Sequence, residues 1–112
     1  METFKNETWR CPDCKRKLNK SNVKDWKCPN CDDTIWIMAD VNGNKYVLER
    51  IKAKEIQKDD VILLDGMHSG EEVKKVKRFG KKIRIYFRKN PALTETSETF
   101  FNTIIGNWEP KD

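Results

Sequence analysis

The sequence predicts a mainly β fold made of two small parts, and three observations support this prediction. The chain has 112 residues, of which 37% are apolar. Each part is therefore expected to need a bound metal ion or a disulfide bond in addition to its hydrophobic core. The phrase Trp-x-Cys-Pro-x-Cys occurs twice, at residues 9–14 and 26–31. After it, runs with a period of two flank glycine-containing turns at 42–44 and 80–81, which is typical of β-hairpins.

The repeated phrase contains all four cysteines of the chain, in two Cys-x2-Cys pairs separated by thirteen residues. No apolar run approaches the roughly 20 residues that span a bilayer, and the N-terminus lacks the apolar core of a signal peptide. We therefore expect a cytosolic protein that does not insert in membranes. Thiols stay reduced in that compartment, so the cysteines are read as metal ligands rather than disulfide halves.

The predicted ligands are Cys11, Cys14, Cys28 and Cys31, and the predicted metal is one structural Zn(II). Four protein ligands close a tetrahedral site and leave no open position for water or substrate. Iron in a rubredoxin-like site suits the same ligands and remains an alternative, as does a redox-active dithiol pair.

Two further features of the repeat concern its local geometry. A proline follows the first cysteine of each pair and presets the tight turn that brings two sulfurs to one metal. Trp9 and Trp26 occupy equivalent positions, two residues before that cysteine, and are expected to pack across the two arms.

Residues 7–39 therefore resemble the zinc ribbon family, in which two such knuckles are joined by hairpins. Many ribbon knuckles carry glycine after the second cysteine, where this chain has Lys15 and Asp32. The backbone there is expected to be left-handed.

The remaining chain is predicted to form short strands with little helix. The expected strands are 35–39, 45–51, 61–64, 72–79, 82–88 and 99–105. A single helical turn or loop is expected within 52–60, and a helix is the alternative for 99–105. The five strands from residue 45 onward are expected to curl into a small barrel.

The stretch 51–66, with the basic hairpin that follows, resembles SH3-like barrels of the KOW and Tudor kind. An OB-like barrel and an open sheet packed on the ribbon are the competing folds. The predicted organisation is a zinc ribbon at 1–39, a five-stranded barrel at 40–108 and a flexible tail at 109–112.

The most basic stretch is residues 73–89, which hold nine lysines and arginines and no acid. The whole chain carries a formal charge of +5, so the other residues together carry −4. The alternation along 82–88 places Arg84, Tyr86 and Arg88 on one face and three apolar side chains on the other. Such a face can follow phosphates and stack a base. The predicted binding residues are Lys74, Lys75, Lys77, Arg78, Lys81, Lys82, Arg84, Tyr86 and Arg88.

The predicted function is a non-catalytic, monomeric regulatory module that binds nucleic acid through this basic hairpin. A solvated face without a partner is the plain alternative for these residues, because lysines also protect sheet edges. The functional alternative is an adaptor or inhibitor that binds an acidic protein surface, of the kind that low-GC bacteria and their phages encode. Trp36 is expected to be covered within the chain, and an exposed tryptophan there would instead mark a partner site.

No motif of a catalytic nucleophile, phosphate loop or paired carboxylates accompanies the cysteines. The single histidine, His68, follows Asp65 in a glycine-flanked loop, and these two residues alone make a poor acid–base pair or second metal site. An enzyme is therefore not expected.

Overall fold

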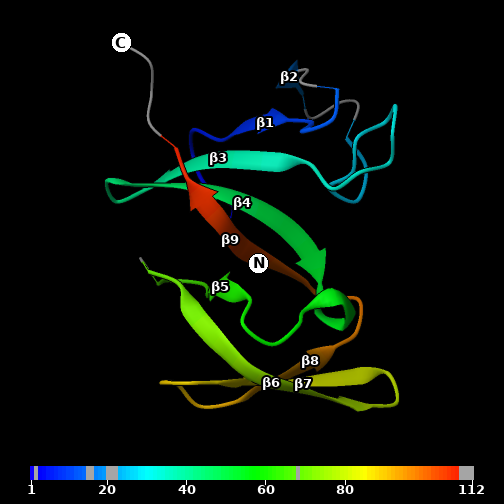
Figure 1. Cartoon of the computed structure of the whole chain (residues 1–112), viewed down its shortest axis with the longest axis vertical. Coiled ribbons are helices and arrows are strands. Elements are labelled where there is room, and N and C mark those ends of the chain that lie inside the picture. The colour runs from blue at the N-terminus through cyan, green and yellow to red at the C-terminus, as the bar shows by residue number, and fades with distance from the viewer. Residues whose placement is uncertain (2, 15–16, 20–22, 68, 109–112) are drawn as a thin grey trace. The chain divides into compact units, whose positions relative to one another are not determined.

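The computed structural model describes residues 1, 3–14, 17–19, 23–67 and 69–108, and these residues form a mainly β protein (Figure 1). The strands are β1 (Thr8–Arg10), β2 (Lys17–Leu18), β3 (Trp36–Val41), β4 (Asn44–Lys52), β5 (Val61–Leu63), β6 (Glu71–Phe79), β7 (Lys82–Phe87), β8 (Leu93–Thr96) and β9 (Phe100–Asn107). One 3-10 turn, η2, covers Ala53–Glu55, within the segment where a helical turn or loop is predicted. None of the helical residues in the described ranges forms a helix that could cross a bilayer.

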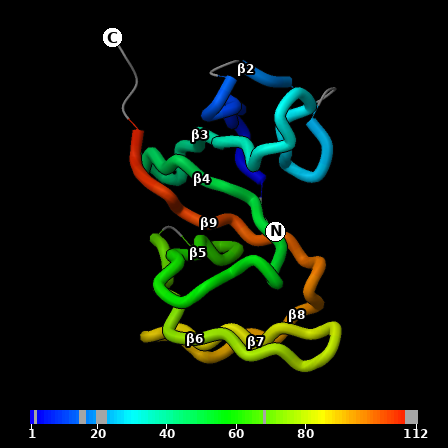
Figure 2. The backbone as a smooth tube through the Cα atoms, turned by 45° about the vertical axis from the view of Figure 1, so that its right-hand side comes forward, coloured from blue at the N-terminus to red at the C-terminus, as the bar shows by residue number. Residues whose placement is uncertain are grey.

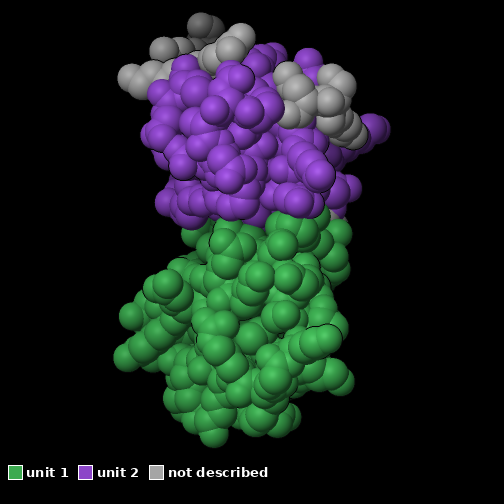
Figure 3. All heavy atoms as spheres, turned by 90° about the vertical axis from the view of Figure 1, so that its right-hand side faces the viewer, with its two compact units in different colours: residues 1–2, 51–104 green, residues 3–50, 105–112 purple. Residues whose placement is uncertain are grey.

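The chain divides into two units by the contacts among its residues. Unit 1 comprises residues 1–2 and 51–104, and unit 2 comprises residues 3–50 and 105–112 (Figure 3). The predicted domain boundary at residue 39 lies inside β3, whose partner β4 continues to Lys52. The division into a ribbon at 1–39 and a barrel at 40–108 stays a prediction, and the predicted tail at 109–112 lies outside the described residues.

Unit 2 contains an antiparallel sheet with the order β2-β1-β3-β4. Its central row of side chains is Trp9, Ile37 and Leu48, which are paired across β1, β3 and β4 and are all buried. The β3–β4 turn consists of Asn42 and Gly43, both with positive φ (51° and 89°), as a type I′ turn requires. This confirms the hairpin predicted from the Asn-Gly pair.

Unit 1 contains an antiparallel sheet with the order β9-β5-β6-β7-β8. Strands β6, β7 and β8 lie side by side in both views of the backbone (Figures 1 and 2). Gly80, with φ of 59°, and Lys81 form the two-residue turn between β6 and β7, as predicted. The core of the unit is apolar and consists of Ala53, Ile56, Ile62, Val73, Ile83, Ile85, Phe87 and Phe101.

Strand β8 was not predicted, because Leu93–Thr96 has no apolar run. It forms because it pairs with β7 from Lys82 to Ile85, with Leu93 and Glu95 half-buried and the two threonines exposed. The helix alternative for 99–105 is wrong, since β9 pairs there with β5 through Ile62 and Leu63. The described residues after residue 43 therefore form six strands rather than five.

Gly70, just before β6, packs against side chains that leave no space for a methyl group. A Cβ at this position would lie 2.2 Å from Cγ1 of Val61 and 2.8 Å from Cδ1 of Ile104. We expect Gly70→Ala to lower the free energy of unfolding by about 1–3 kcal/mol, the usual cost of overpacking. Urea unfolding measures this loss. Ser69→Ala, an exposed neighbour, serves as the control, and an unchanged midpoint in Gly70→Ala would contradict the packing.

Candidate metal centre and basic face

The four cysteines of unit 2 are free thiols whose sulfur atoms all lie within 4.8 Å of one another. The Sγ atom of Cys31 is 3.3 Å from that of Cys11 and 3.8 Å from that of Cys14. A tetrahedral zinc with Zn–S bonds of about 2.3 Å requires sulfurs about 3.8 Å apart. The four sulfurs therefore fit one tetrahedral metal ion, and the structure brings together all four predicted ligands.

A backbone N–H closes the turn of each knuckle by a hydrogen bond. In the first, the N–H of Cys14 donates to Sγ of Cys11 at 3.4 Å. In the second, the N–H of Asp32 donates to the carbonyl of Cys28 at 2.9 Å, and Asp32 has a φ of 61°. The left-handed backbone expected after the second cysteine is thus present at Asp32, while Lys15 lies outside the described residues.

The thiol pKa values differ within the cluster. Backbone N–H groups of Cys31 and Asn30 face the Cys28 sulfur and lower its pKa to about 7. The N–H of Asp33 favours the Cys31 thiolate, but the neighbouring thiol of Cys11, burial and the other sulfurs outweigh it and raise the Cys31 pKa. In the absence of a metal the cluster thus resists holding several thiolates, and a bound cation must displace protons from it.

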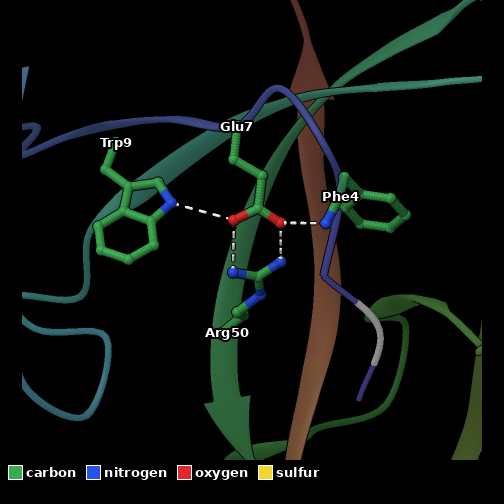
Figure 4. Close-up of polar contacts among 4 residues, drawn as sticks. All are labelled: Phe4, Glu7, Trp9 and Arg50. Atoms are coloured by element: carbon green, nitrogen blue, oxygen red, sulfur yellow. Dashed lines mark hydrogen bonds and ion pairs between the residues drawn. The ribbon is translucent and has the colours of Figure 1, made fainter. Parts of the chain in front are cut away.

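A polar cluster in unit 2 joins Phe4, Glu7, Trp9 and Arg50 (Figure 4). The rings of Trp9 and Trp26 meet edge to face with centroids 5.2 Å apart, which confirms the predicted packing of the two arms. The guanidinium of Arg50 lies 4.4 Å from the centre of the Trp26 ring and forms two hydrogen bonds to the Glu7 carboxylate. The indole N–H of Trp9 (3.0 Å) and the N–H of Phe4 (2.6 Å) also donate to that carboxylate.

The hydrogen bonds fix the charge state of Glu7. Burial would raise its pKa, but the bonds from Arg50, Phe4 and Trp9 outweigh burial and hold the pKa below the ordinary value of 4.5. The ion pair is therefore charged at neutral pH. Glu7 directly precedes β1 and Arg50 belongs to β4, so the ion pair links these two strands beside Trp9 and Trp26.

Neither Glu7 nor Arg50 was predicted as a functional or structural site from the sequence. A signal was present in the sequence, because Arg50 follows Leu48 by two residues and therefore shares its face of β4, and the structure buries both side chains. Glu7, 43 residues away, has no pattern that marks it as the partner of Arg50.

The β6–β7 hairpin of unit 1 separates the predicted binding residues into two groups. Opposed residues of an antiparallel pair point to the same side of a sheet. The pairs Lys75–Tyr86, Lys77–Arg84 and Phe79–Lys82 therefore share the face that points away from the core. We call the following residues the basic face: Lys75, Lys77, Phe79, Lys82, Arg84 and Tyr86.

The other predicted residues lie elsewhere. Arg78 is opposite Ile83 and donates to the carbonyl of Lys54 at 2.9 Å. Arg88 forms ion pairs with Asp59 (3.1 Å) and Glu72 (3.3 Å). Lys74 is exposed at the register shift between Val73 and Lys75, and Lys81 is exposed in the turn.

Three further residues were singled out from the sequence, namely Asp65, His68 and Trp36. Asp65 forms an ion pair with the amino group of Met1 at 3.4 Å. His68 lies outside the described residues. Trp36, expected to be covered, is 38% exposed.

No protein-family model matches the chain, and no curated protein or solved structure is significantly similar to it.

Proposed function

We propose that the protein is a non-catalytic regulatory module that binds nucleic acid through the basic face. The observation that carries this proposal is the composition of that face: four cations surround one tyrosine and one phenylalanine on neighbouring strands. Two acidic side chains at the end of the hairpin opposite its turn, Glu72 and Asp59, are paired with Arg88. Lysine and arginine in this arrangement suit phosphates, and binding would release counterions.

We further propose that the four cysteines hold one structural Zn(II) and that the region around them is a zinc ribbon. Support comes from the sulfur spacing, the Cys-Pro-x-Cys turns and the left-handed Asp32. A closed set of four thiolate ligands suits a structural ion, and iron is the competing occupant. For unit 1, the proposal of a small SH3-like or OB-like barrel rests on its five short antiparallel strands, which pair in the described residues as an open sheet with the order β9-β5-β6-β7-β8.

The nucleic-acid proposal is tested by fluorescence anisotropy with labelled DNA and RNA, single-stranded and duplex, on the zinc-loaded full chain. For three or four phosphate contacts, affinity should fall roughly 20- to 150-fold between about 50 and about 200 mM salt. The variant Lys77→Glu, Lys82→Glu, Arg84→Glu is expected to bind at least about tenfold more weakly, because it repels the same phosphates.

The control carries the same change in net charge away from the basic face: Lys5→Glu, Lys24→Glu, Lys58→Glu, three exposed lysines. It is expected to keep most of the affinity. Equal losses in both variants would mean that net charge alone attracts nucleic acid, and no binding of any nucleic acid at low salt would end the proposal.

A protein-binding adaptor is the second candidate, and the exposure of Trp36 favours it. Tryptophans are enriched among the residues that dominate protein interfaces. A partner bound through Trp36 would be lost in Trp36→Ala and would be much less sensitive to salt than a nucleic acid.

A further inference from the structure

Two aromatic rings lie among the cations of the basic face. Phe79, the last residue of β6, is 55% exposed, although burying such a ring would be favourable. Tyr86 is half-buried in β7 and belongs to the same face through its pairing with Lys75. The face thus offers apolar, flat surface as well as charge.

The cations are placed around the tyrosine ring. The ammonium of Lys75 lies 4.7 Å and the guanidinium of Arg84 5.7 Å from its centre. Both residues are exposed, and their long side chains can leave the ring for a phosphate while a base takes their place. The cations that could bind phosphates of a nucleic acid therefore lie within one side-chain length of a ring on which one of its bases could stack.

The two rings are spaced along the strand direction. Phe79 is paired with Lys82, which precedes Tyr86 by four residues in β7, so the two positions are offset by about 13 Å along the strands, at about 3.3 Å per residue. A stacked nucleic-acid strand advances about 3.4 Å per nucleotide, so this separation corresponds to about four nucleotides. One short strand can reach both rings.

We infer that the basic face binds single-stranded nucleic acid, with unpaired bases stacked on Phe79 and Tyr86. This inference rests on the proposed function. A duplex hides the flat faces of its bases, whereas a single strand exposes them to aromatic side chains. A face made for duplex phosphates alone would gain nothing from an exposed phenylalanine. Deoxyribose and ribose strands share the chemistry used here, namely phosphates and the flat faces of bases.

The test compares oligonucleotides of about 12 nucleotides, within the usual site size of about 4–16. Single-stranded DNA, single-stranded RNA, the matching duplexes and a DNA strand whose central positions are abasic are titrated with the full chain. Stacking contributes about 5- to 150-fold in affinity per base, so the abasic strand should bind at least about fivefold more weakly than the intact strand. The single strands should bind more tightly than the duplexes.

The protein variants Phe79→Leu and Tyr86→Leu keep apolar volume and charge but remove the rings. Each should lower single-strand affinity at least about fivefold, leave the salt dependence unchanged and leave duplex affinity unaffected. Lys77→Glu, Lys82→Glu, Arg84→Glu should instead weaken every complex. The abasic strand tests the same stacking with the wild-type protein, so a variant that fails to fold does not decide the result.

The outcomes separate the two proposals. Equal affinity for intact and abasic strands, or tighter binding of duplexes, would overturn the single-strand inference and leave binding through phosphates in place. Absence of binding by every oligonucleotide at low salt would overturn the proposed function itself.

Discussion

Changing Cys28 to serine is expected to abolish tight metal binding and to unfold the part of unit 2 around the cysteines. A structural Zn(II) contributes about 10–16 kcal/mol of apparent binding free energy in small zinc domains at neutral pH. The cysteine segments have few elements of their own besides the short β1 and β2, so little else can replace the metal. Cys28 is also the thiol whose pKa is lowered, to about 7, which makes it the readiest thiolate of the cluster.

Metal content per chain and the absorption of a Co(II)-substituted sample measure this effect. The wild type should bind one ion with the spectrum of a tetrahedral thiolate site, and a strong zinc chelator should reproduce the unfolding seen in Cys28→Ser. Because protons compete for the thiolates, affinity should fall as the pH is lowered, and more steeply below about 7, where the Cys28 thiolate is protonated as well.

Asp13→Asn provides the matched control. Asp13 and Asp33 each place a carboxylate oxygen within 4.8 Å of the Cys31 sulfur. If the sulfurs alone hold the ion, Asp13→Asn should retain the metal with near wild-type affinity. A Cys28→Ser protein that still binds one zinc tightly, or a chelated protein with an unaltered circular dichroism spectrum, would contradict a structural metal.

The cysteine cluster could be predicted because its signal is local. The spacing of Cys11 and Cys14, and of Cys28 and Cys31, determines which sulfurs can meet, and the duplicated tryptophans mark equivalent positions of the two arms. The turns at Asn42-Gly43 and Gly80-Lys81 were found for the same reason, since a positive φ requires particular residues at adjacent positions.

The features that were missed depend on residues far apart in the sequence. Strand β8 exists through its pairing with β7 and has only weak alternation of its own. The basic stretch looked uniform in sequence, yet Arg78 and Arg88 are held by Lys54, Asp59 and Glu72. Only the register of β6 and β7 separates these anchored arginines from the cations of the basic face.

Glu7→Gln is expected to lower the free energy of unfolding by about 3–5 kcal/mol, the usual cost of removing one partner of a buried ion pair. The side chains of Arg50 and Glu7 are 0% and 8% exposed, so the change would remove a carboxylate charge that faces a buried guanidinium. Urea unfolding of the zinc-loaded proteins at neutral pH measures the loss, with metal content checked in both.

Glu98→Gln is the control for this experiment. It removes the same group from an ion pair with Lys52 and Lys54 in unit 1, where Glu98 is 58% exposed. Exposed pairs are screened by water, so this variant should change the unfolding midpoint little. Similar losses in the two variants would mean that burial does not distinguish the two pairs.

The same pair predicts how stability depends on pH. The pKa of Glu7 is lower in the folded chain than its ordinary value of 4.5, so the unfolded state takes up a proton first on acidification. The contribution of the pair is thus fully present above about pH 4.5 and is lost as the pH falls through the folded pKa. We therefore expect the difference in unfolding free energy between wild type and Glu7→Gln to be constant near neutrality and to shrink below about pH 4.5. Release of a bound metal at acid pH would affect both proteins, so the difference in unfolding free energy between them isolates Glu7. If this difference stayed constant down to pH values below the folded pKa, it would contradict a charged, hydrogen-bonded carboxylate at this position.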